Sequence, residues 1–211
     1  MHALIREARR EIELAEEWAD RTIAYATEHG FPYWLTLCSM LKSWLLDQQG
    51  PSAAGVAQFR QGLDGYRATG AKLGLSWFLT LMAEMLAKHG ATEEALGMIA
   101  EALAHIDASS ERYYEAEVHR VKGELLLTRG GPDAAAAAEA SFLHALEVAR
   151  RQSAKVWELR TATSLARLWG AQDRRRAAGE LLTGVYGWFS EGLDTTDVRD
   201  ARSVLDELGA L

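Results

Sequence analysis

A turn glycine recurs at a fixed interval along this chain of 211 residues, and this spacing limits the available folds more than any other property of the sequence. Gly50, Gly90 and Gly130 are each 40 residues apart, and Asp173 takes the place of a fourth. Each turn lies between two stretches with helical apolar spacing, which predicts a helix–turn–helix unit. A period of roughly 20–50 residues indicates a repeat architecture, in which each unit buries its apolar face by stacking on its neighbours.

Small residues recur after each turn in a small–x3–apolar–x2–small pattern. In residues 81–104 the pattern is Ala95, Ile99 and Ala102. Two antiparallel helices approach closely only where small side chains meet, and large side chains then fill the flanking gaps. The equivalent residues elsewhere are Gly55/Phe59/Gly62, Ala138/Phe142/Ala145 and Ala178/Leu182/Val185, the last departing at Val185, which is not small. The pattern therefore predicts four packed helix pairs.

The composition favours an all-α fold. Only 3 residues are proline, and each lies within one or two residues of a glycine, so the stretches between turns can remain helical. No run of β-branched and aromatic residues with period two stands out. The net charge of −7 argues against nucleic-acid binding, which requires a basic face. Cys38 is the only cysteine, so no internal disulfide can form, and its apolar neighbours predict a buried, inert thiol.

The repeated units resemble the tetratricopeptide repeat. The signature places hold Leu79, Met82, Ala83, Leu86, Gly90, Ala95, Ile99 and Ala102 in the second unit, and Ala162, Leu165, Ala166, Trp169, Ala178 and Leu182 in the fourth. The resemblance implies a right-handed α-solenoid of antiparallel helix pairs in a single domain, 1–211. The first and third units depart from it, because Lys42 and Lys122 occupy a place that is usually apolar. The helix register there is open by one residue.

We expect the domain to consist of six consecutive segments. They are an N-terminal helix that is half of a truncated repeat (1–30), four repeats (31–70, 71–108, 109–152 and 153–190) and a C-terminal capping helix (191–211). The first helix, 4–29, has small and apolar residues along one side. If the upstream repeat is missing, an apolar face of this helix is exposed, and we expect weak self-association to a homodimer. Thr195 or Thr196, followed by Asp197, begins the capping helix.

A narrower resemblance covers nearly the whole chain. The segments `HGFPYWL`, `EAEVHRVKGELLL` and `VYGWFSEGLDTTDVRDARSVLDEL` are similar to the C-terminal repeat region of large bacterial multidomain regulators. In that family, a nucleotide-cyclase or winged-helix output domain precedes a signal-transducing ATPase module, and helical repeats come last. The resemblance implies a fragment or a stand-alone relative that lacks both, with a role in signal transduction.

No motif supports catalysis. The stretch `TGAKLG` at 69–74 lacks the spacing and the Ser/Thr of a phosphate-binding loop. Glu115 and His119 lie four apart on one helix face and offer two metal ligands, but further ligands are not visible nearby. We interpret them as a hydrogen-bonded pair and expect neither a metal nor another cofactor. The first 17 residues are charged throughout, which excludes a signal peptide or a membrane span there and favours the cytoplasm.

The tryptophans suggest a binding surface. In the tetratricopeptide register, Trp44 and Trp77 fall at positions that line the concave groove, where large amphipathic rings are typical binding anchors. The same face continues through Thr80, Glu84, Arg120, Glu124, Arg160 and Arg167. The alternative for Trp77 is packing against the preceding helix pair.

These observations predict a non-enzymatic protein–protein interaction module that binds a segment of a partner protein in its groove. One alternative is an intramolecular sensor that binds a small effector or the ATPase module of a parent protein. A less favoured alternative is a small helical enzyme. That would require titratable groups that converge in a pocket, and the spacing of such residues offers none.

Overall fold

The computed structural model describes residues 10–210, and all regular structure among them is helical. The helices are α2 (Ile12–His29), α3 (Pro32–Gln49), α4 (Ala53–Ala68), α5 (Leu75–Lys88), α6 (Thr92–Ser109), α7 (Glu115–Arg129), α8 (Ala134–Arg151), α9 (Lys155–Ala171), α10 (Arg175–Tyr186) and α11 (Thr196–Leu208). The prediction of an all-α fold is confirmed. Residues 4–9 of the predicted first helix and residue 211 of the capping segment lie outside the described residues.

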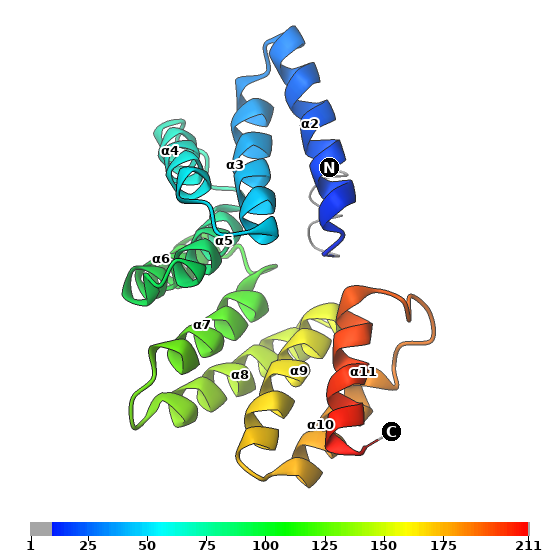
Figure 1. The fold of residues 1–211 in the computed structure, drawn as a ribbon. Helices are drawn as coiled ribbons and strands as arrows, with labels where there is room; N and C mark the ends of the chain where they lie inside the picture. The colour runs from blue at the N-terminus through cyan, green and yellow to red at the C-terminus, as the bar shows by residue number, and fades with distance from the viewer. Residues whose placement is uncertain (1–9, 211) are drawn as a thin grey trace. The chain divides into compact units, whose positions relative to one another are not determined.

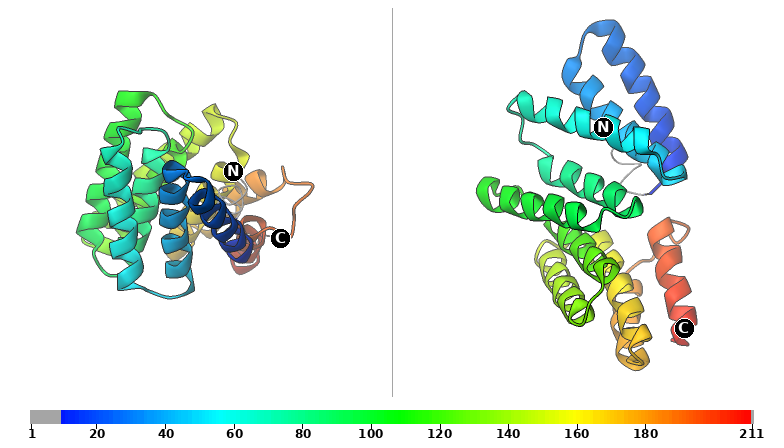
Figure 2. Two further views of the ribbon diagram at one scale, coloured as in Figure 1. Left: turned by 90° about the horizontal axis from the view of Figure 1, so that it is seen from above. Right: turned by 60° about the vertical axis from the view of Figure 1, so that its left-hand side comes forward.

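The chain divides into two compact units, Met1–His105 and Ile106–Leu211, and the boundary falls inside α6. Within the first unit, α3 packs against α2, α4 and α5. Within the second, α9 packs against α7, α8, α10 and α11. Figures 1 and 2 show that successive helices such as α2 and α3, or α7 and α8, run antiparallel and are joined by short connections. Each helix A of the predicted repeats is thus followed by its helix B, while the tetratricopeptide family and the single domain stay predictions.

The connections adopt the backbone that their residues favour. Gly90 and Gly130 have φ of +78° and +74°, a region that costs glycine little. Asp173 has φ of +60°, and Asp tolerates this region better than most residues. Gly50 differs, because its backbone is extended with φ of 168°. Pro51 follows it, and a residue before proline is restricted to extended conformations.

Small residues lie where the helices approach each other. A Cβ atom on Gly62 of α4 would lie 2.4 Å from Cγ of Met40 on α3. A Cβ atom on Gly123 of α7 would lie 2.4 Å from Cε1 of Phe142, a fully buried ring on α8. The small residues of the repeated pattern that are fully buried include Ala95, Ala102, Ala138, Ala145 and Ala178. The predicted close packing after each turn therefore agrees with the burial of these residues.

The apolar stripes of α3 and α7 are buried despite the lysine that each helix carries. Cys38, Leu41 and Leu45 are buried on α3, as are Val118, Val121 and Leu125 on α7. Lys42 is half-buried and directs its ammonium group to Asp20 on α2. A lysine can thus lie beside this stripe, because its alkyl stem packs while its charge meets an acid.

The two end helices of the described chain also bury their predicted apolar sides. On α2, Ala15, Ala19 and Ala26 are buried, and this helix packs on α3. On α11, Val198, Ala201, Val204 and Leu205 are buried, and this helix packs on α9 and α10. Across residues 10–210, no helix is both long enough and apolar enough to cross a membrane.

Candidate functional site

The tryptophans predicted to anchor a partner are buried. Trp44 on α3 is 6% exposed and Trp77 on α5 is 7% exposed, and the Trp77 ring lies 4.7 Å from that of Phe78. An anchor for a partner must be accessible, so the expectation of exposed rings at these two positions does not agree with the structure. The physical reason for Trp44 is that α3 has three neighbouring helices and little free surface.

The other predicted residues of α5 and α9 differ in exposure. Thr80 is fully buried and donates its hydroxyl hydrogen to the carbonyl oxygen of Ser76, at 2.8 Å. Glu84 is half-buried, and Arg167 is exposed on α9. Thr80 therefore has its hydrogen-bonding capacity turned inward, and among these three only Glu84 and Arg167 are accessible to a partner.

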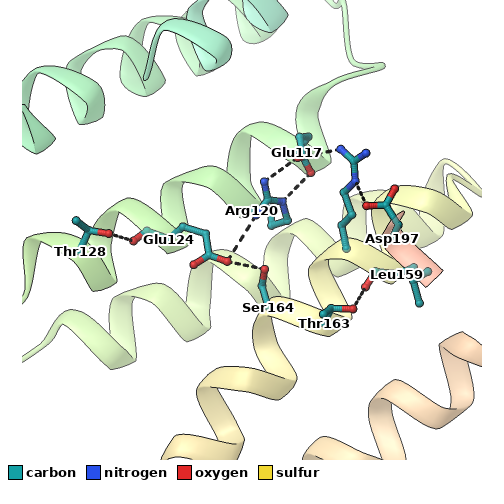
Figure 3. A network of polar contacts seen from close by, with 9 residues as sticks. Glu117, Arg120, Glu124, Thr128, Leu159, Thr163, Ser164 and Asp197 are labelled. Carbon is teal, nitrogen blue, oxygen red and sulfur yellow. Dashed lines mark hydrogen bonds and ion pairs between the residues drawn. The ribbon is translucent and has the colours of Figure 1, made fainter. Parts of the chain in front are cut away.

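Three predicted residues of the second unit come together in one polar network, which Figure 3 shows. The guanidinium of Arg120 donates from Nε and Nη2 to both carboxylate oxygens of Glu117, each at 2.8 Å. Arg160 on α9 donates from Nη1 to Glu117 at 3.4 Å and from Nε to Asp197 on α11 at 2.8 Å. This chain of charges joins α7 to α9 and α9 to α11.

The network continues along α7 to Glu124. Nη1 of Arg120 lies 3.5 Å from Oε1 of Glu124, and Ser164 on α9 donates its hydroxyl hydrogen to the same oxygen at 2.6 Å. The side chain of Glu124 is 45% exposed, whereas those of Arg120 and Arg160 are 16% and 12% exposed. The network thus begins at the surface with Glu124 and runs inward to Glu117.

Mutual attraction keeps the buried members of this network charged. Burial alone would raise the pKa of Glu117, but the guanidinium groups of Arg120 and Arg160 outweigh it, and the pKa lies below its ordinary value. Burial would lower the pKa of Arg160, but Glu117 and Asp197 outweigh it and raise the pKa. The acids and bases therefore compensate each other. This arrangement suits the joining of helices better than proton transfer, which needs a group whose pKa lies near 7.

Sequence reasoning missed two members of this network and did not commit to a third. Ser164 went unnoticed, and Asp197 was interpreted only as a residue of the first turn of the capping helix. Glu117 lies on the predicted face, but its role as the central acid depends on burial. The available signal was the 40-residue repeat itself, because Glu117 and Trp77 hold equivalent places and a carboxylate in a buried place needs a cation.

An exposed aromatic patch, formed by Tyr25, Phe31, Tyr33 and Trp34, surrounds the connection from α2 to α3. The four residues are 58%, 46%, 37% and 39% exposed in that order. Pro32 begins α3 and fixes the first turn, which holds Tyr33 and Trp34 next to the connection. Four large rings within ten residues of sequence therefore face solvent in the first unit.

The rings of the aromatic patch contact each other and a buried neighbour. Tyr25 stacks on His29 with ring centroids 4.0 Å apart, and Phe31 lies 6.3 Å from Tyr25. Tyr33 lies edge-on to Trp34 at 5.3 Å and is 6.0 Å from the buried Tyr66 of α4. These contacts restrict the rings, so a partner that binds them loses less side-chain entropy.

Comparison with known proteins gives a limited match. No protein-family model matches this chain. An uncharacterized protein of Rhizobium meliloti (strain 1021) is 27% identical to it over 160 residues, which is 76% of this chain. The matched region makes up 15% of that protein, so this chain is similar to a small part of a much longer relative.

Proposed function

We propose that this chain is a non-enzymatic protein-interaction module and that the aromatic patch of the first unit is its contact surface. The observation that supports the proposal is the exposure of four aromatic residues in one place, held by contacts between their rings. Aromatic residues are enriched among the side chains that contribute most to protein interfaces, because they offer a large contact area with few rotatable bonds.

The partner that fits this surface is a protein segment with Arg or Lys interspersed among apolar side chains. Aromatic faces attract cations, and apolar side chains pack against the rest of each ring. The neighbouring helix adds negative charge, since α2 carries Glu13, Glu16, Glu17, Asp20 and Glu28 against a single Arg21. Its charges would steer a basic segment toward the patch and raise its association rate.

A second candidate is that the partner segment belongs to the same polypeptide. The length of the relative favours it, because the match covers only 15% of that protein. In that case the module would act as an intramolecular sensor within a signalling protein of the kind that the sequence resembles. A tetratricopeptide-like solenoid would be its scaffold.

The test measures binding of two synthetic peptides to the 211-residue chain by fluorescence anisotropy. One peptide alternates Arg with Leu and Val, and the other has Glu in place of every Arg. We expect the basic peptide to bind and the acidic peptide not to bind. Trp34→Ala should weaken the basic peptide by at least about 30-fold, the ordinary effect of removing an aromatic anchor.

Trp188→Ala is the matched control, because Trp188 is also exposed but lies in the second unit. It should bind the basic peptide as the wild type does. The proposal is wrong if both peptides bind equally well, or if Trp34→Ala and Trp188→Ala have the same effect.

A further inference from the structure

Three metal-binding side chains meet between α7 and α8 in the second unit. Glu115 and His119 lie one helical turn apart on α7, and His144 comes from α8, which packs on α7. One ligand atom from each residue lies within 4.8 Å of the others. The sequence offers only the first two together, and the helix pairing supplies the third from 25 residues beyond His119.

The donor set of this cluster is that of a zinc site. Two imidazole nitrogens and one carboxylate oxygen are ligands that Zn²⁺ takes in proteins, and three protein ligands leave a fourth position for water or another donor. The ligand atoms of a tetrahedral site lie closer together than 4.8 Å, so the side chains must turn inward slightly. His144 has the freedom to do so, because its side chain is 46% exposed.

Glu115 supplies a second, independent indication. It is buried, and its Oε2 makes no hydrogen bond to any described residue. A buried carboxylate oxygen without a hydrogen bond is costly, and a bound cation would compensate it. The other oxygen, Oε1, accepts a hydrogen bond from Nη1 of Arg112 at 2.9 Å, which fixes the orientation of the carboxylate.

The two histidines favour the neutral form that a metal requires. Their ring centroids are 4.3 Å apart with the planes at 74°. Burial first, and then the positive charges that His144 and Lys122 can carry, lower the pKa of His119 to about 4. The His119 imidazole is therefore uncharged at neutral pH and keeps a lone pair for a metal.

Cations near the cluster limit the affinity. Nη2 of Arg151 lies 3.7 Å from Oε2 of Glu115, and Arg112 holds the other oxygen. Both guanidinium groups repel a divalent ion, and Arg151 must move away from Oε2 when a metal binds. This competition favours ions that bind nitrogen ligands strongly over Mg²⁺ and Ca²⁺, which prefer oxygen ligands.

We propose that Glu115, His119 and His144 bind a divalent transition-metal ion, with Zn²⁺ as the best fit, and that the ion joins α7 to α8. This proposal does not depend on the aromatic patch, which lies in the first unit. An ion held by both helices would add a bond between them that the packing of the side chains alone does not provide.

The experiment titrates the metal-free 211-residue chain with Zn²⁺ in competition with a chromophoric chelator, and with Co²⁺ to record the visible spectrum of a nitrogen-ligated ion. We expect one Zn²⁺ per chain and a higher melting temperature when Zn²⁺ is present. His144→Ala should weaken Zn²⁺ binding by at least about tenfold, since even residues that only support a metal ligand commonly change affinity by about 10–100-fold.

His29→Ala is the matched control, because His29 is an exposed histidine at the end of α2 in the first unit. It should bind Zn²⁺ as the wild type does. Glu115→Gln keeps the size of the side chain but removes the charged ligand, and should also weaken binding. The proposal is wrong if the wild type binds no stoichiometric Zn²⁺, if His144→Ala binds it as tightly as the wild type, or if His29→Ala weakens binding equally.

Discussion

Helices α5 and α7 begin 40 residues apart, at Leu75 and Glu115, and each is the first helix of its pair. The buried residues of α5 are apolar apart from two hydroxyl side chains, Ser76 and Thr80. Those of α7 include the carboxylates Glu115 and Glu117. Equivalent places in two copies of one repeat therefore bury an indole in one unit and a charged group in the other, as Trp77 and Glu117 illustrate.

This difference shows that one helix-pair architecture can be stabilised in two ways. Apolar burial has little directional preference and tolerates substitutions that preserve volume. A buried carboxylate is tolerated only when cations and hydrogen bonds compensate it, and the loss of one partner leaves the other uncompensated. We therefore expect the second unit to depend on individual side chains of its network more strongly than the first unit depends on its surface charges.

The largest effect should follow from Arg160→Ala. This change removes the cation that links Glu117 to Asp197 and leaves both acids buried, with Glu117 retaining only Arg120. Breaking a buried ion pair typically costs about 3–5 kcal/mol of unfolding free energy. Urea unfolding followed by circular dichroism measures it. Arg167→Ala on the same helix is exposed and should cost less than about 0.5 kcal/mol. Equal costs for the two variants would show that the network does not stabilise this unit.

Glu158 makes the second unit sensitive to acid. Burial would raise the pKa of this carboxyl group, but hydrogen bonds from Lys155 and Arg150 outweigh it, and the pKa lies below its ordinary value. A lowered pKa in the folded state stabilises the protein above the pKa of the unfolded chain, about 4.3, and this stabilisation is lost as the pH falls through the folded pKa.

Glu158→Gln should therefore cost about 1.5–3 kcal/mol at pH 7, the usual range for hydrogen bonds to a charged group. The difference between wild type and variant should shrink once the pH falls below about 4. Urea unfolding at a series of pH values measures it. Glu180→Gln, at an exposed ion pair with Arg176, is the control and should show little difference at any pH. A cost for Glu158→Gln that stays constant from neutral to acid pH would contradict this account.

The fold could be predicted from the sequence to the level of helix pairs, because turn glycines and small residues recur with a period that packing imposes. The positions of Ala95, Ala102 and Ala138 illustrate this, since all three are buried as predicted. The candidate site was predicted only in part. Arg120 and Arg160 were assigned to one face, but their partner Asp197 comes from α11 and could not be placed from helix spacing alone.

The burial of Trp44 and Trp77 could not be predicted for a related reason. A repeat register indicates which side of a helix a residue occupies, but not how many neighbouring helices cover that side. The same limitation applies to the metal-binding cluster, where Glu115 and His119 share a helix face by spacing, whereas His144 depends on the register between α7 and α8.

Gly123→Ala tests how closely the two helices of the α7–α8 pair approach. The equivalent residue of α5 is Ala83, which is fully buried, so that pair has room for a methyl group. On α7 the added Cβ atom would lie 2.4–2.8 Å from three atoms of the Phe142 ring, and the ring or the helix must move. We expect a cost of about 1–3 kcal/mol, the usual range for overpacking.

Gly184→Ala on α10 is the matched control for this variant, because a Cβ atom there would meet nothing within 4 Å. It should be neutral or stabilising by up to about 1 kcal/mol, since alanine restricts the unfolded chain. Thermal unfolding of both variants measures the difference. If Gly123→Ala were as stable as Gly184→Ala, the pair would not approach as closely as the structure indicates.

The smallest effect should come from the surface charges of the first unit. Nη2 of Arg67 on α4 lies 2.6 Å from Oε1 of Glu101 on α6, but the two side chains are 34% and 44% exposed. Water competes for both groups, so Arg67→Ala should cost only about 0.2–1 kcal/mol, although this ion pair is shorter than those of Arg160. Raising the ionic strength should reduce that cost further and leave the cost of Arg160→Ala nearly unchanged, because salt screens exposed charges more than buried ones. Urea unfolding of both variants at low and high salt provides the comparison. An Arg67→Ala cost that is as large as that of Arg160→Ala, or equally insensitive to salt, would mean that burial is not what separates the charges of the two units.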